Sequence, residues 1–91
     1  MKAVRVIISG RVQGVWFRGW TIEAAYHHGL DGWVRNRRDG TVEAVFAGDD
    51  EQVEAMIQAC RHGPSMARVT GIERFDHDAP VEPGFHPKPS L

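Results

Sequence analysis

Hydrophobic and polar residues alternate over residues 3–9, close to the N-terminus. A period of two is typical of a β-strand with at least one buried face, so this segment is predicted to be the first strand. The positions on one side are Val4, Val6 and Ile8. After a glycine-containing loop, residues 17–28 carry apolar and small side chains at helical spacing, and Gly29 can adopt the left-handed conformation that ends a helix. We therefore expect a strand, a loop and a first helix in that order.

Two β-rich runs follow within residues 30–48 and meet at Asp39-Gly40. This dipeptide favours a tight turn because glycine accepts a positive φ angle. The two runs are therefore predicted to form a β-hairpin.

A second helix is predicted between Asp49 and the Gly63-Pro64 pair. Asp49, with Gln52 three residues later, fits a capping box. Apolar residues then recur at helical spacing and form one stripe. The stripe consists of Val53, Met56, Ile57 and Cys60. Because Cys60 belongs to this stripe, we interpret it as a core residue rather than a nucleophile.

Residues 67–75 form the last predicted strand, with Val69 and Phe75 on one side and Ile72 on the other. The element order is then β-α-β-β-α-β, which is that of the ferredoxin-like split βαβ fold. In this α+β fold class, two helices cover one face of an antiparallel sheet.

The C-terminal residues 76–91 hold four of the five prolines. Proline cannot donate a hydrogen bond to a sheet ladder, so this tail is predicted to contain at most a short edge strand around residues 84–86. A chain of 91 residues has room for one core, and we expect a single domain over residues 1–91.

Composition narrows the possible partners. A net charge of −1 and a pI near 6.5 provide no overall positive field for nucleic acid, so any anion site must be local. Arg5 interrupts the N-terminal apolar run, and no later run approaches the roughly 20 residues of a membrane span. A single cysteine excludes an internal disulfide and agrees with a reducing compartment. We expect a cytoplasmic protein with no membrane partner.

The loop between the first strand and the first helix is the most unusual segment. Gly10 and Gly14 permit conformations in which successive N–H groups point toward one centre, and the first turn of a helix adds free donors and a positive dipole end. Arg18 lies in that turn, and its planar guanidinium suits phosphate oxygens. On spacing alone, the alternative is that the glycines only turn the chain and Arg18 is a solvated surface charge. The segment lacks the Lys-Ser/Thr pair of a nucleotide-binding P-loop.

Asn36 is the second candidate, because it shares a strand face with Val34, where an amide needs partners for its donor and its acceptor. On spacing alone, the alternative is a polar residue that stabilises the hairpin, which is the more common role of a strand asparagine. The neighbouring Arg35, Arg37 and Arg38 are expected on the solvated side of the hairpin, where they would raise the local potential for anions.

No general acid, base or nucleophile emerges from the remaining residues. The histidines show no paired spacing for a metal, and they lie at positions 27, 28, 62, 77 and 86. Asp49 and Asp50 are better explained as helix-capping residues than as acid-base catalysts.

Two long blocks resemble the signature sequences of the acylphosphatases. They are "GRVQGVWFR", residues 10–18, and "GLDGWVRNRRDGTVEAVFAG", residues 29–48, and the likeness extends from about Lys2 to Phe75. The resemblance implies hydrolysis of the carboxyl-phosphate bond of acyl phosphates without a metal or cofactor. It also implies that Arg18 binds the phosphoryl group and that Asn36 orients the attacking water. The backbone N–H groups implied to cradle the phosphate are those of Gly14, Val15, Trp16, Phe17 and Arg18.

A small-molecule acyl phosphate is the expected partner, and we expect a monomer that binds no nucleic acid. The sequence departs from the family pattern at His28, where an aliphatic residue would continue the helix stripe, and in the closing "GFHPKPSL". Two alternatives stay open. RNA-recognition domains share this element order but stack bases on clustered aromatics of the central strands, where this hairpin has only Trp33 and Phe46. A phosphate-binding domain without catalysis is the other.

Overall fold

The computed structural model describes residues 1–91, with five strands and two helices in the order β1-α1-β2-β3-α2-β4-β5. Strands β1, β2, β3, β4 and β5 span Lys2–Arg11, Asp31–Asn36, Val42–Gly48, Arg68–Asp76 and Phe85–Pro87. Helices α1 and α2 span Phe17–His27 and Asp50–Cys60. Every element expected from the sequence is present, and most boundaries move by one or two residues.

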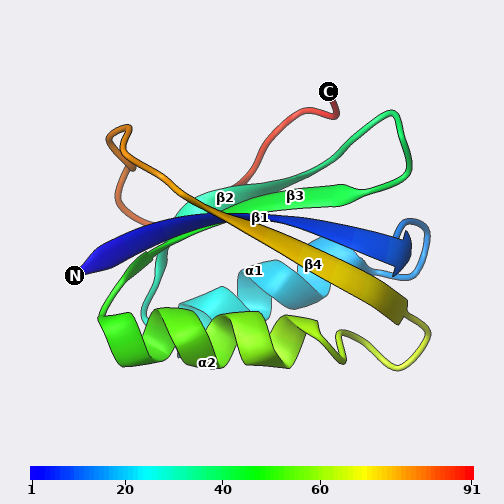
Figure 1. Ribbon diagram of the computed structural model, residues 1–91, viewed down its shortest axis with the longest axis horizontal. Coiled ribbons are helices and arrows are strands. Elements are labelled where there is room, and N and C mark those ends of the chain that lie inside the picture. The colour runs from blue at the N-terminus through cyan, green and yellow to red at the C-terminus, as the bar shows by residue number, and fades with distance from the viewer.

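The strands form one sheet in the order β4-β1-β3-β2-β5, and both helices pack on the same face of it (Figure 1). This arrangement confirms the ferredoxin-like α+β fold. The sheet is not entirely antiparallel, because β5 pairs in parallel with β2. The β1–α1 loop and the β2–β3 loop lie at the same end of the sheet, on the right in Figure 1. The fold therefore brings the two candidate segments together.

The core lies between the sheet and the helices, and it contains the predicted stripes of β1 and α2. Val6 and Ile8 are fully buried in β1, as is Met56 in α2. Cys60 is also buried, and burial raises the pKa of its thiol to about 12. The thiol is therefore protonated at neutral pH, which confirms Cys60 as a core residue.

The ends of the helices differ in two details from the sequence predictions. Asp49 is the N-cap of α2 but makes no side-chain cap hydrogen bond, so the predicted capping box is absent. Gln52 instead places its Oε1 2.7 Å from Nδ1 of His28. His28 is the C-cap of α1 and not a member of its apolar stripe. Its polar ring therefore serves a contact between the two helices.

A β-bulge changes the predicted facing of β4. Ser9 pairs with Gly71, and the next residue of β1 pairs with Val69, so Thr70 is an extra residue on β4. An extra residue reverses the alternation of side chains beyond it. Val69 and Ile72 consequently both pack against the core, although strict alternation predicts opposite sides.

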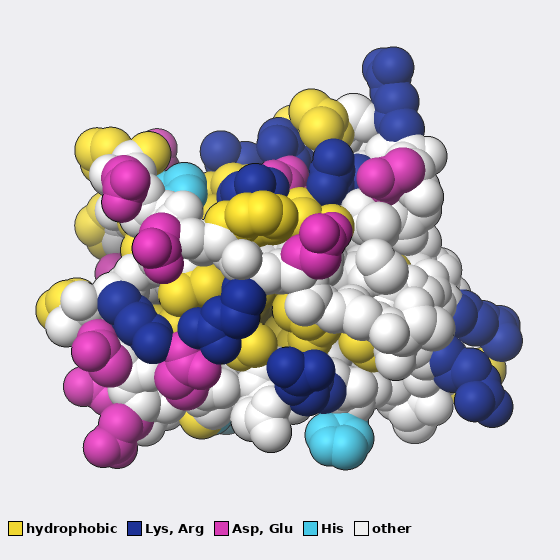
Figure 2. All heavy atoms as spheres, viewed as in Figure 1, with side chains coloured by type: hydrophobic (Ala, Val, Ile, Leu, Met, Phe, Trp, Pro, Cys, Tyr) yellow, Lys and Arg dark blue, Asp and Glu magenta, His cyan; other side chains and the backbone are white.

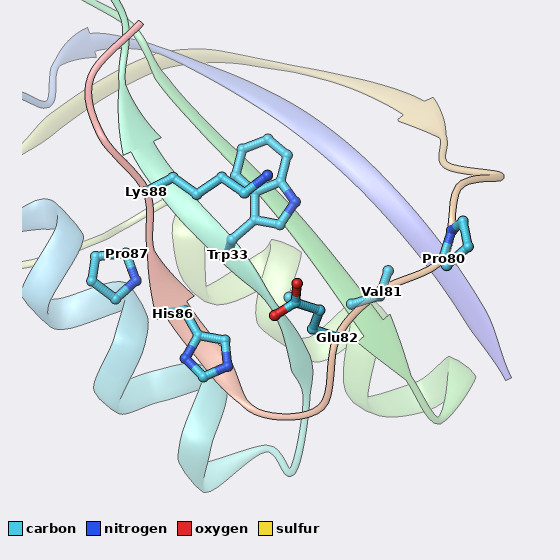
Figure 3. A pocket seen from close by; sticks show the side chains of 8 residues that line it. Trp33, Pro80, Val81, Glu82, His86, Pro87 and Lys88 are labelled. Atoms are coloured by element: carbon cyan, nitrogen blue, oxygen red, sulfur yellow. The ribbon is translucent and has the colours of Figure 1, made fainter.

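The C-terminal tail packs against the sheet edge and includes the short edge strand expected there. Phe85 stacks on Phe46 in the core, with ring centroids 5.6 Å apart. The Lys88 backbone N–H donates to the Val34 carbonyl oxygen at 2.9 Å, and its side chain lies over the Trp33 ring (Figure 3). These contacts extend the tail alongside β2 toward the hairpin loop.

The sheet face away from the helices carries a buried carboxylate between two arginines. Glu43 accepts hydrogen bonds from Arg5 Nη1 at 2.9 Å and Arg35 Nε at 2.7 Å. Arg5 also lies over Phe75, and Arg35 lies over Trp33. Arg35 is thus partly buried in an ion pair, whereas the sequence predicted it to be solvated.

Neither helix of the protein is long and apolar enough to cross a membrane.

Acid is expected to weaken this cluster. Burial raises the pKa of Glu43, but the hydrogen bonds from Arg35 and Arg5 outweigh it and hold the pKa below its usual 4.5. A lowered folded-state pKa contributes stability above pH 4.5, which is lost as the pH falls through the folded pKa. Glu43→Gln should reduce the free energy of unfolding at pH 7 by about 1–3 kcal/mol and by less at pH 3.

Urea unfolding of both proteins at the two pH values measures this difference. Glu73→Gln is the matched control, because Glu73 lies exposed on β4 and takes part in no ion pair. An equal destabilisation by Glu43→Gln at both pH values would contradict the ionic contribution.

Candidate active site

Three buried side chains hold the β1–α1 loop in place. Val12, Val15 and Phe17 are 1%, 8% and 1% exposed, and all three belong to the core cluster. The residues between them point away from the core, and both Gly14 and Trp16 are exposed. This alternation fixes the backbone of the loop with its polar groups toward solvent.

The backbone φ angles of the loop alternate between positive and negative values. Gly14 has φ 74° and Trp16 has φ 67°, while Val15 between them has a negative φ. Such alternation turns successive N–H groups toward one concave side, which is an anion-binding geometry. The N–H groups of residues 13–16 donate to no backbone carbonyl of the chain. The first turn of α1 adds further N–H groups without intrahelical acceptors.

Arg18 is exposed in the first turn of α1, and its guanidinium makes no ion pair or hydrogen bond within the chain. Asn36 is the last residue of β2, opposite Val42 on β3. Its side chain lies on the same strand face as the fully buried Val34, as predicted. No side-chain hydrogen bond within the chain involves the Arg18 guanidinium or the Asn36 amide, so both groups are free to bind a ligand.

One cavity of about 280 Å³ contains both groups. It lies between the loop, the first turn of α1 and the end of β2. Its lining residues are Val12, Gly14, Trp16, Phe17, Arg18, Gly19, Asn36 and Pro87. Of the residues that the acylphosphatase resemblance assigns to the site, only Val15 is outside this set.

Comparison with known proteins agrees with this geometry. The acylphosphatase family model matches residues 4–87. The acylphosphatase of Rhodospirillum rubrum is 59% identical over 91 residues, which cover the whole of both chains. The chain belongs to the acylphosphatase family. The acylphosphatase of Rhizorhabdus wittichii is 53% identical over 98% of this chain and 90% of its own. The family match thus extends beyond Phe75 into the tail.

The acylphosphatase likeness holds in three dimensions as well. The crystal structure of the acylphosphatase from Bacillus subtilis superposes with a TM-score of 0.92 at 32% identity. The match covers 97% of this chain and 99% of that chain.

Gln13 supports the candidate site of this acylphosphatase family member, and its contacts were not predicted from the sequence. Its Nε2 donates to the backbone carbonyl oxygens of Arg37 and Thr41, both at 2.8 Å. The Arg37 N–H donates to the Thr41 carbonyl at 2.9 Å and closes the same loop. Gln13 therefore ties the β1–α1 loop to the segment that directly follows Asn36.

Asp39 stiffens that segment from the other side. Its Oδ1 accepts a hydrogen bond from the Thr41 hydroxyl at 2.6 Å and one from the Thr41 N–H at 3.0 Å. These bonds lower the pKa of the Asp39 carboxyl. Both walls of the cavity are thus held by a network that needs no ligand.

The other candidate residues lie outside this cavity. Arg38 is exposed, and Arg37 pairs with Asp39 at 3.9 Å. No group of three or more His, Cys, Asp and Glu side chains gathers at a spacing suited to a metal. A second cavity, of about 250 Å³, lies beside Trp33 and Lys88 under the tail (Figure 3). It contains neither Arg18 nor Asn36.

Proposed function

We propose that the protein hydrolyses acyl phosphates to a carboxylate and inorganic phosphate within the cavity that holds Arg18 and Asn36. The backbone N–H groups of residues 14–18 and the Arg18 guanidinium bind the phosphoryl oxygens. Asn36 orients the water that attacks phosphorus. The observation that carries the proposal is that three groups border one cavity. They are the loop whose φ angles alternate in sign, the unpaired guanidinium of Arg18 and the side-chain amide of Asn36. Membership of the acylphosphatase family supports it.

The leaving group explains how the site could work without a general acid. Cleavage of the bond between the bridging oxygen and phosphorus expels a carboxylate, whose conjugate acid has a pKa of about 4 to 5. It departs as an anion at neutral pH. Water forms the new bond to phosphorus, and its proton passes to a phosphoryl oxygen late in the reaction. No base is required if the transition state is loose.

Positioning and charge stabilisation are then the remaining requirements. In a loose transition state, charge spreads over the equatorial phosphoryl oxygens, which need donors that are already oriented. The buried anchors and the Gln13 bonds fix these donors before substrate arrives. One preorganised donor contributes roughly 3 to 4 kcal/mol in such sites, or about 10² to 10³ in rate.

The charge distribution favours entry of an anion at this end. Acidic side chains gather over the N-terminal end of α2. Basic side chains are spread over the face shown in Figure 2, and one group of them lies at the opposite end, on the right. Arg11 and Arg68 lie opposite each other on β1 and β4, at the end of β1 that leads into the β1–α1 loop. Arg37 and Arg38 extend the basic region along the β2–β3 loop. A local positive field of this kind raises the association rate of an anionic substrate.

The RNA-binding alternative is less well supported. Phe46 is fully buried on the helix side of the sheet, so it offers no surface for a base. Trp33 lies on the outer face, but Arg35 and Lys88 lie over its ring at 4.9 and 4.5 Å. Every group of the proposed site comes from one chain, so we propose that a monomer is active.

Acetyl phosphate and benzoyl phosphate should both be hydrolysed, with rates unchanged by EDTA. Phenyl phosphate should react at least about 10³-fold more slowly, because phenol has a pKa near 10 and is a poor leaving group without an acid. Release of inorganic phosphate measures all three reactions. Loss of activity in EDTA would contradict the mechanism. Hydrolysis of phenyl phosphate at the same rate as the two acyl phosphates would also contradict it. Binding of phosphate without turnover of any substrate would favour the alternative of a phosphate-binding domain that has no catalytic activity.

Gln13→Glu tests whether the loop must be tied to the hairpin. A carboxylate of the same size cannot donate and would face two carbonyl oxygens. We expect kcat for benzoyl phosphate to fall roughly tenfold, with a smaller change in KM, because the distance between Arg18 and Asn36 is no longer fixed. Gln58→Glu is the control, since Gln58 only accepts a bond, from Arg61, which a carboxylate also does. Equal kcat in Gln13→Glu and Gln58→Glu would contradict a positioning role.

A further inference from the structure

The geometry of the cavity indicates where the acyl group of the substrate lies, if the proposed function holds. One wall comes from the sheet and carries Asn36 and Pro87. The other wall comes from the β1–α1 loop and the first turn of α1, and it carries Trp16, Arg18 and Gly19. In-line displacement puts the attacking water and the leaving group on opposite sides of phosphorus. With water beside Asn36, the carboxylate leaves toward the wall that carries Trp16.

Trp16 is unusual in both conformation and exposure. It is the only residue other than glycine with a positive φ, and its side chain is 62% exposed. Residues held in such sparsely populated backbone regions cluster at functional sites. Phe17, the other aromatic residue of the cavity, is buried in the core. Trp16 is therefore the aromatic side chain that a ligand in this cavity can cover.

Gly19 holds the indole in this place. A Cβ atom built on Gly19 would overlap the Trp16 indole at Nε1 and Cδ1. Glycine is a poor helix former, yet here it lies within the first turn of α1. Its missing side chain leaves room for the indole to lie against the helix. A bulky residue at positive φ and a glycine in a helix thus combine to present one fixed aromatic face beside the phosphate loop.

We propose that Trp16 forms an acyl-group subsite that favours flat, apolar acyl groups such as aroyl groups. Contact stabilises a bound group in proportion to the apolar area that it covers, and offset stacking of two rings adds to this. A benzoyl group can cover the indole face, whereas an acetyl group covers little of it. The subsite therefore selects among acyl phosphates by their acyl part, while the loop and Arg18 bind the part that they share.

The test compares kcat/KM for benzoyl phosphate with that for acetyl phosphate in three variants. Trp16→Gly removes the indole and accepts the positive φ, and Gly19→Ala keeps the indole but displaces it. We expect each to lower the ratio of kcat/KM for benzoyl phosphate to kcat/KM for acetyl phosphate by about tenfold. Tyr26→Ala is the control, because Tyr26 is also an exposed aromatic residue and lies near the other end of α1. It should leave the preference unchanged.

The same assay separates this proposal from the proposed function. If the unmodified protein hydrolyses neither substrate, the function itself is wrong. If it hydrolyses both and Trp16→Gly leaves their ratio unchanged, only the subsite is overturned. An equal loss for both substrates in Trp16→Gly also overturns it, because the residue would then serve the shape of the loop. The expected binding result is that Trp16→Gly weakens competitive inhibition by benzoylphosphonate more than it weakens inhibition by inorganic phosphate.

Discussion

Arg18→Ala is expected to lower kcat/KM for benzoyl phosphate by roughly 10²- to 10³-fold, with a large rise in KM. Arg18 is the one fully charged side chain that lines the cavity, so it should contribute to binding of the phosphoryl group as well as to the reaction. Inhibition by inorganic phosphate should weaken in the same variant. The free energy of unfolding should change by less than about 0.5 kcal/mol, because the side chain is exposed and unpaired.

Arg18→Lys separates charge from geometry. A lysine keeps the positive charge but presents a point charge without the planar fork of donors that matches two phosphoryl oxygens. We expect it to recover phosphate binding more than kcat. Arg61→Ala is the matched control, since Arg61 lies exposed at the end of α2, where its guanidinium bonds only Gln58. Phosphate inhibition of Arg18→Ala equal to that of Arg61→Ala would exclude Arg18 from the phosphate site.

The predictions that succeeded rest on local patterns. The apolar stripe of α2 and the alternation of apolar and polar residues in β1 each indicate which face of the element is buried. The order of such elements along the chain then indicates the fold class. Asn36 could be placed on the core side of β2 for the same reason, because Val34 is two residues away. The left-handed conformations of Gly10 and Gly14 could be predicted because backbone freedom is a property of glycine itself. That the loop binds an anion stays a prediction.

The predictions that failed depend on partners distant in sequence. The bulge beside Thr70 arises from pairing with β1, so alternation within β4 gives no sign of it. Gln52 bonds His28, 24 residues away, and not the start of its own helix. Gln13 escaped notice for a similar reason, because its two acceptors are main-chain carbonyls 24 and 28 residues away. A carbonyl group is present at every residue, so no residue type marks it as a partner.

Asn36→Ala is expected to lower kcat by roughly 10²- to 10³-fold while inhibition by inorganic phosphate stays nearly unchanged. In the proposed mechanism, the amide holds the attacking water and not the phosphoryl group. Its loss should therefore raise the barrier of the chemical step without weakening binding in the ground state. The backbone of Asn36 pairs with Val42, and its carbonyl accepts the Leu91 N–H at 3.1 Å. Alanine keeps both contacts, so the hairpin should remain in place.

Asn36→Asp gives the sharper comparison, because it keeps the size of the side chain and changes its charge. A carboxylate could still accept a hydrogen bond from water, but it would repel the substrate dianion and weaken phosphate inhibition. We therefore expect Asn36→Ala to affect kcat alone and Asn36→Asp to affect both kcat and binding. Steady-state kinetics with phosphate as a competitive inhibitor distinguish the two. If Asn36→Ala weakened phosphate inhibition as strongly as Arg18→Ala, the two residues would share one role, and the water would have to be oriented by another group of the cavity.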